Sequence, residues 1–180
     1  LGFRLVPSPP TNRRIITTGC ETALEETCFP IKVAHGHILE LLARKVDYLF
    51  LPCVVNLDHV SSDAETSYNC LYVQSLPYVA RAAIDFSKYP SKVLMPVFHF
   101  EWGKKVFVPE MEALARELGC SGKQVLRAIT AAWDNLYSFR KKLVRRGEEI
   151  LALLPAGNPA LVLVSRPYNG CDPGLNFRIP

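Results

Sequence analysis

The 180-residue sequence lacks several features that would assign it to a familiar class. No apolar run reaches the ~20 residues that a membrane-spanning helix needs, and there is no Cys-x-x-Cys pair, low-complexity tract or fixed-period repeat. A large excess of one charge is absent too, because 17 Asp and Glu nearly balance 21 Lys and Arg, which leaves a net charge of +4. These absences exclude membrane spans, zinc fingers and thioredoxin motifs, and give no basis for nucleic-acid binding.

What the sequence does contain is enough apolar surface for a folded core. Hydrophobic residues make up 49% of the chain, which excludes intrinsic disorder. The six cysteines, at positions 20, 28, 53, 70, 120 and 171, are too few and too scattered for a secreted disulfide scaffold. We therefore expect a reducing cytoplasm, with the thiols either inert or metal-bound.

Four short apolar runs that end near a proline predict buried strands at residues 3–6, 46–51, 92–96 and 160–165. Helical spacing of apolar residues predicts helices between them, over 11–18 (ended by Gly19), 29–44, 72–85, 109–118 and 121–154. The alternation predicts an α/β fold with a mostly parallel sheet and flanking helices. The sequence therefore predicts a first domain at 1–154, which ends with the long helix. A linker at 155–159 then leads to the start of a further α/β unit at 160–180. Both ends look cut, which predicts a piece of a larger protein.

Three cysteines stand where chemistry is expected in such a fold. Cys53 follows the strand at 46–51, at the carboxyl edge where parallel sheets bind ligands. Cys28 and Cys70 each precede a helix, whose free N–H groups and dipole stabilise thiolate. Convergent thiolates at long spacing suit a [4Fe–4S] cluster with one open iron. Zinc held by three Cys with His35 or His37 is a competing interpretation, as are simply buried cysteines.

Four ordered motifs carry a family resemblance. They are residues 26–37 (ETCFPIKVAHGH), 48–53 (YLFLPC), 69–75 (NCLYVQS) and 164–169 (VSRPYN), the last followed by 172–176 (DPGLN). Together they resemble acyl-CoA dehydratase activase-related domains, or CoA-substrate-specific enzyme activases. These are similar to the iron–sulfur components of 2-hydroxyacyl-CoA dehydratases and benzoyl-CoA reductases.

The resemblance implies a flavodoxin-like domain that binds a [4Fe–4S] cluster through Cys28, Cys53 and Cys70. Leu71 replaces a proline common in the family, and Cys171 stands where the family usually has a non-ligand, so Cys171 is either incidental or a fourth ligand. No glycine-rich phosphate loop is present, and any ATPase activity would belong to an ATP-dependent activase domain or subunit acting as partner.

Neighbouring polar residues have two interpretations each. Lys32, His35 and His37 could bind a CoA phosphate or relay protons, or only pack and solvate a helix. Asn69, Gln74 and Arg166 could bond cluster sulfurs or an acyl carbonyl, or only cap helices and pair on the surface. Cys20 and Cys120 follow glycines at predicted helix ends and are interpreted as structural.

Two functions follow as hypotheses. The first is a cytoplasmic, anaerobic electron-transfer module within a CoA-dependent dehydratase or reductase system, with an acyl-CoA as the substrate. The second is a non-catalytic scaffold that docks an activase to its dehydratase. Neither involves nucleic acid or a membrane, and a homodimer is compatible with both.

Overall fold

The computed structural model describes residues 1–24, 26–58, 66–155, 157 and 159–176. The chain forms two compact units. One contains Gly2–Leu114 with Ser165–Pro180 and is called here the α/β unit; the other contains Ala115–Val164 with Leu1 and is called the helical unit. The division predicted from the sequence, into 1–154 and 160–180, stays a prediction.

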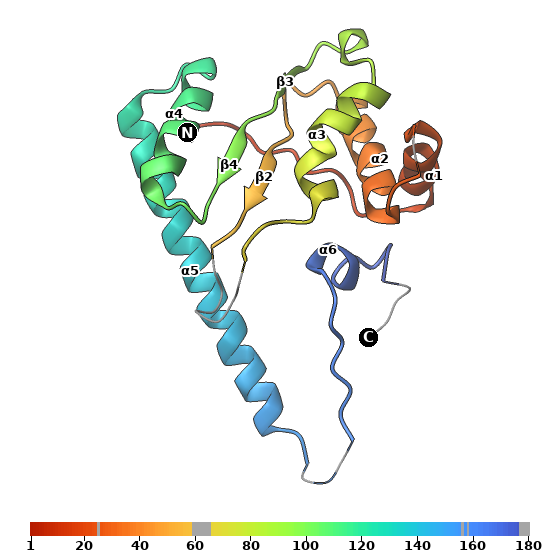
Figure 1. The fold of residues 1–180 in the computed structure, drawn as a ribbon, viewed down its shortest axis with the longest axis vertical. Coiled ribbons are helices and arrows are strands. Elements are labelled where there is room, and N and C mark those ends of the chain that lie inside the picture. Colours follow the sequence, from red (N-terminus) through yellow and green to blue (C-terminus); the bar gives the residue numbers. More distant parts are fainter. Residues whose placement is uncertain (25, 59–65, 156, 158, 177–180) are drawn as a thin grey trace. The chain divides into compact units, whose positions relative to one another are not determined.

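The α/β unit confirms the predicted α/β class, with short parallel strands and helices beside them (Figure 1). Pairs of short strands alternate with helices along the chain. Its elements are α1 (Arg13–Thr22), α2 (Phe29–Ala43), β1 (Tyr48–Phe50), β2 (Cys53–Asn56), α3 (Leu71–Ala83), the 3-10 turn η1 (Phe86–Lys88), β3 (Lys92–Leu94), β4 (Val97–His99), the start of α4 (Lys104–Glu117) and α6 (Pro167–Gly170).

Prolines divide the parallel pairing into two small sheets. β1 pairs with β3, and β2 pairs with β4. Pro52 and Pro96 lie between them and offer no N–H to a ladder. The pairing nevertheless resumes, since Leu51 N donates to Leu94 O at 2.9 Å and Cys53 N donates to Pro96 O at 2.8 Å. Each proline therefore interrupts the parallel pairing without stopping it. The sequence pattern predicted instead that the strand ends at the proline.

The predicted strands at 3–6 and 160–165 are wrong, because the structure forms no ladder there. Leu5 is 90% exposed and Leu161 is 102% exposed. A strand is defined by a neighbour that pairs its backbone groups, and an apolar run cannot by itself supply one. Periodicity of side chains therefore overpredicted strands where no partner strand lies alongside.

The core of the α/β unit lies between α2, α3 and the strand β1. Its buried members are Ile38, Leu42, Leu49, Leu51, Ala80 and Ile84. α1 packs on α2 through glycines: a Cβ at Gly19 would lie 2.2 Å from Lys32 O, and a Cβ at Gly36 would lie 2.0 Å from Ile15 O. The prediction that Gly19 ends the first helix is wrong, because this glycine is used for helix contact and α1 continues to Thr22.

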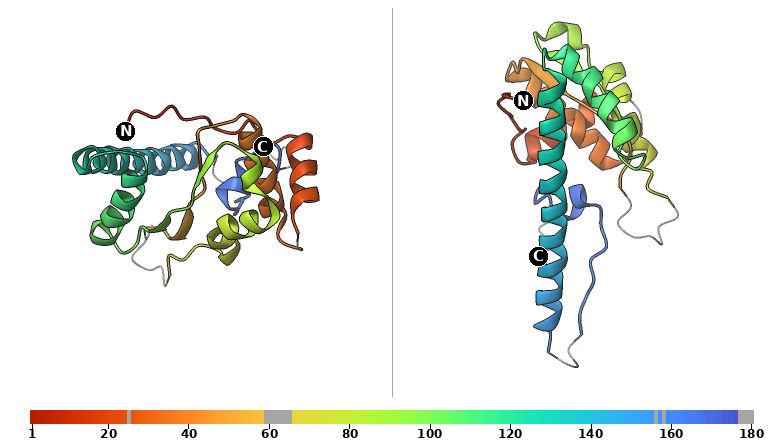
Figure 2. Two further views of the ribbon diagram at one scale, coloured as in Figure 1. Left: turned by 90° about the horizontal axis from the view of Figure 1, so that it is seen from above. Right: turned by 90° about the vertical axis from the view of Figure 1, so that its left-hand side faces the viewer.

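The helical unit consists mainly of α5 (Gly122–Ala152), one uninterrupted helix in both views of Figure 2. Ser121 caps its first turn, with Gln124 reaching back to the Ser121 backbone in the predicted capping box. The helix ends two residues before the predicted 154, a difference within ordinary fraying. Many apolar side chains of α5 are exposed, among them Leu143, Val144 and Leu151.

Candidate functional site

A cavity of about 320 Å³ lies within the α/β unit. Its walls come from the first half of α2, the first half of α3 and the segment that carries α6. Most of the lining is apolar. The lining residues are Cys28, Pro30, Ile31, Val33, Ala34, His37, Cys70, Tyr72, Val73, Leu76, Tyr168, Asp172 and Leu175.

Two of the three predicted ligand cysteines line this cavity, and both are helix N-caps. Cys28 precedes α2 and Cys70 precedes α3, each in an extended or near-extended conformation. The carbonyl of Cys28 accepts from Ile31 N at 3.0 Å, and that of Cys70 accepts from Val73 N at 2.9 Å. Neither thiol takes a capping hydrogen bond. Both cysteines therefore stand at the positive end of a helix dipole.

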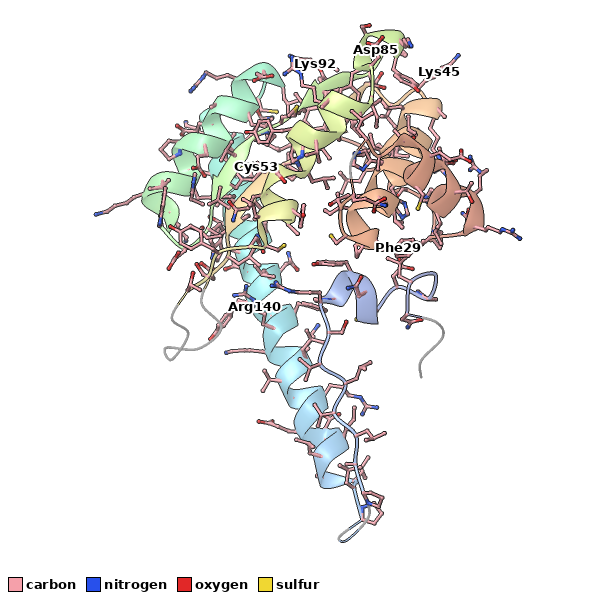
Figure 3. The ribbon with its side chains drawn as sticks, turned by 45° about the vertical axis from the view of Figure 1, so that its right-hand side comes forward. Phe29, Lys45, Cys53, Asp85, Lys92 and Arg140 are labelled. Atoms are coloured by element: carbon pink, nitrogen blue, oxygen red, sulfur yellow. The ribbon has the colours of Figure 1, made fainter. Side chains whose placement is uncertain are left out.

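Cys53 lies elsewhere in the unit. It is the first residue of β2, is 6% exposed and does not line the cavity. Figure 3 labels it well apart from Phe29, the neighbour of Cys28. Burial raises the pKa of the Cys53 thiol, so the protonated form is favoured. Within the described residues, no three His, Cys, Asp or Glu side chains are grouped closely enough to hold a metal ion.

The remaining cysteines lie outside the cavity. Cys171 follows α6 and is exposed, although the next residue, Asp172, lines the cavity. Cys20 is an exposed residue of α1, and Cys120 is half-buried in the helical unit just before α5.

Of the other predicted site residues, Lys32, His35 and Asn69 do not line the cavity and have local partners. Lys32 pairs with Glu26 at 2.8 Å. The ring of His35 is buried and donates from Nδ1 to Ile31 O at 2.8 Å. Asn69 donates from its side chain to Val54 O at 2.9 Å.

Gln74 and Arg166 are likewise placed at helix starts. The Gln74 side chain donates to Asn69 O at 2.8 Å. Arg166 is the exposed N-cap of α6, without a side-chain capping bond. The Gln74 contact fixes the residue that precedes the N-cap of α3, and the structure brings neither side chain into the cavity lining.

A hydrogen-bonded chain of three side chains borders the cavity, and the sequence interpretation found only His37 of the three. The Thr11 hydroxyl donates to Asp172 Oδ2, and its oxygen contacts His37 Nε2 at 3.0 Å. Because the hydroxyl proton goes to the carboxylate, His37 Nε2–H is the donor in the second bond. Asp172 belongs to the segment 172–176 (DPGLN), which is part of the family resemblance, but nothing in the spacing of the sequence links Asp172 to Thr11.

The network is held by burial and close backbone contact. Thr11 is 8% exposed, and a Cβ at Gly174 would lie 2.5 Å from Thr11 O, so this position needs glycine. Burial lowers the pKa of His37, while the Asp172 and Glu40 carboxylates oppose part of that shift. The neutral imidazole is thus the favoured form, with the hydrogen bond to Thr11 setting its tautomer.

A second titratable pair lies at the carboxyl end of β4. His99 Nδ1 donates to Glu110 Oε1 at 2.6 Å, and His99 N donates to Glu110 Oε2 at 3.1 Å. The ring stacks on Trp102 with centroids 4.0 Å apart. The carboxylate fixes the imidazole orientation, as in many structural and catalytic His–carboxylate pairs. The sequence interpretation did not single out this pair.

The comparison with known families decides where the chain belongs. The sequence profile described as CoA enzyme activase uncharacterised domain (DUF2229) matches residues 1–180. The chain belongs to this family. The predicted CoA enzyme activase-related resemblance is thereby confirmed over the whole length. No curated protein and no solved structure matches the chain.

Within the described residues of this activase-related domain, no helix is long and apolar enough to cross a membrane. The cavity with Cys28 and Cys70 combines thiols, the half-buried imidazole of His37 and a carboxylate. We therefore take it as the candidate functional site of the domain.

Proposed function

We propose that this domain is a redox module that holds a [4Fe–4S] cluster through Cys28, Cys53 and Cys70. The observation that carries the proposal is the position of Cys28 and Cys70, two N-cap thiols from different helices in the lining of one cavity. Thiolates are the ligands that such clusters use, and helix N-termini stabilise them. Cys28 and Cys70 fit the donor set in chemistry and in location.

Cys53 is the weakest member of the proposed set. It is buried outside the cavity lining, and its raised thiol pKa opposes the deprotonation that iron binding needs. Its ligand role rests on the family resemblance alone. A direct test of Cys53 is therefore part of the proposal.

A bound cluster would supply one-electron transfer, directed in this proposal toward dehydration or reduction of a CoA thioester. The chain's own contribution is the environment. Apolar side chains such as Ile31, Val73 and Leu76 line the cavity beside the two cysteines, and they would influence the potential of a bound cluster through the local dielectric. The electron would come from an ATP-dependent activase domain or subunit in an anaerobic cytoplasm.

The test is anoxic purification followed by reconstitution with ferrous iron and sulfide. We expect a brown protein with broad absorbance near ~400 nm and about four irons per chain. Cys28→Ser and Cys70→Ser should each lose most of the iron, because an alkoxide replaces thiolate poorly. Cys120→Ser in the helical unit is the matched control and should retain it.

Two further variants refine the ligand set. Iron loss in Cys53→Ser equal to that in Cys28→Ser would establish the third ligand, and full iron retention would remove Cys53 from the set. Cys171→Ser separates a four-thiolate cluster from one with an open iron. Equal iron content in all cysteine variants would overturn the cluster assignment.

The alternative function is a docking scaffold for an activase, with structural cysteines. The exposed apolar side chains of α5, including Leu143, Val144 and Leu151, favour it because such surface commonly meets a partner. A colourless protein after anoxic reconstitution, which binds an activase and loses binding in Leu143→Glu, would favour the scaffold over the redox module.

A further inference from the structure

The charge of the cavity lining is concentrated in one side chain. Among its described lining residues Asp172 is the single acid, and neither lysine nor arginine lines it. The nearest basic side chain on α2, Lys32, is engaged with Glu26 outside the lining. His37 adds no positive charge in its favoured neutral form. One end of the cavity is thus anionic, and the remaining wall is largely apolar.

The carboxylate of Asp172 is fixed in place. Oδ2 accepts from the Thr11 hydroxyl, and Oδ1 accepts from Gly174 N at 2.8 Å. Gly174 in turn touches the Thr11 backbone so closely that a Cβ has no room there. A carboxylate held by two donors on different parts of the chain cannot rotate away from an approaching ligand.

We propose that this cavity binds a small ligand with a short apolar body and an uncharged or cationic polar end, and that Asp172 rejects carboxylates. The apolar wall would cover the body, and the volume exceeds the ~150 Å³ of a cavity that binds benzene, so four-carbon molecules fit inside it. A ligand anion would lie near the fixed carboxylate, and none of the described lining residues is a lysine or arginine that would offset the repulsion. The proposal deepens the proposed function and rests on it only in sharing the cavity.

The experiment uses metal-free protein and three probes of equal chain length: 1-butanol, butylammonium and butyrate. Dissociation constants come from titrations followed by the methyl resonances of Val33, Val73 and Leu76, which line the cavity. We expect butanol and butylammonium to bind at least about tenfold more tightly than butyrate. Asp172→Asn should bring butyrate and butylammonium within about threefold of each other.

Asp172→Asn preserves the network, because an Asn amide can donate to Thr11 while the Thr11 hydroxyl donates to His37 in the other tautomer. Asp134→Asn, an exposed position of α5, is the matched control and should leave the preference unchanged. Ala34→Leu fills the cavity and should abolish binding; Val73→Phe serves the same purpose if the first variant fails to fold.

Equal binding of butyrate and butylammonium by the original protein would overturn the proposal. So would an unchanged preference in Asp172→Asn, or absence of saturable binding. Because the titrations need no iron, they stand apart from the cluster test. Binding retained in Cys28→Ser with iron lost would support the cavity proposal independently of the redox proposal.

Discussion

The α/β unit and the helical unit stabilise their helices in different ways. In α2, of 15 residues, Ile31, Val33, Ile38 and Leu42 are buried together with Gly36. In α5, of 31 residues, only Val125 and Ile129 are buried among those described. α2 depends on tertiary packing, whereas α5 depends on its capping box and on its intrahelical bonds and ion pairs. The cavity belongs to the unit in which long-range contacts dominate.

The largest contrast is expected for loss of a leucine. Leu42→Ala removes a side chain that is 1% exposed in the core, and should lower the free energy of unfolding by about 2–5 kcal/mol. Leu143→Ala on α5, where the side chain is 55% exposed, should change it by about 0.5 kcal/mol or less. Urea denaturation followed by circular dichroism measures both. Similar losses would mean that α5 is buried in solution.

The same glycine substitution should have opposite signs in the two units. Gly36→Ala forces a Cβ to within 2.0 Å of the Ile15 carbonyl, and should destabilise by about 1–3 kcal/mol or more. Gly147→Ala on α5 meets nothing within 4 Å, and should stabilise by about 0.5–1 kcal/mol through helix propensity. Thermal unfolding midpoints report both signs. A neutral Gly36→Ala would refute the close contact of α1 with α2.

Loss of a helix cap should have a smaller effect. Ser121→Ala removes the side-chain acceptor for Gln124 N and should cost about 1 kcal/mol. Asn12→Ala, which removes the cap of α1 in the α/β unit, is the matched change. Both are measured as shifts in the urea midpoint. If only Asn12→Ala destabilises, the start of α5 does not contribute to the measured transition.

The smallest expected effect is a pH dependence confined to the cavity. Burial lowers the pKa of His37, so the unfolded state binds a proton more readily than the folded state. Stability is therefore complete above the ordinary histidine pKa of about 6.5 and decreases as pH falls toward the lowered folded value. His37→Gln should flatten this part of the profile, measured by urea midpoints against pH. An unchanged slope would place His37 in a solvated environment.

Local signals were sufficient for much of the fold. Ser121 and Gln124 mark the start of α5, Pro30 marks the first turn of α2, and apolar spacing predicts α3 to within two residues at each end. Each of these depends on contacts between residues close in the chain. The sequence also predicted that Cys28 and Cys70 precede helices, because helix starts have recognisable residues.

The parts that could not be predicted depend on distant residues. Apolar runs at 3–6 and 160–165 carry strand-like side chains, but no strand in the described part of the chain pairs with them. Gly19 is read locally as a helix end, whereas its role is contact with Lys32 on another helix. Thr11 and Asp172 are 161 positions apart and meet through a hydrogen bond that no spacing encodes.

Short-range patterning in this sequence therefore specifies the helices, the α/β class and the two cysteine caps, since hydrogen bonds and side-chain periodicity within a few residues determine them. Long-range packing specifies which caps share a cavity, where Cys53 lies and how Asp172 is held. These outcomes depend on how α1, α2 and the segment after residue 164 approach one another. That approach is controlled by glycines, whose missing side chains leave no hydrophobic pattern in the sequence.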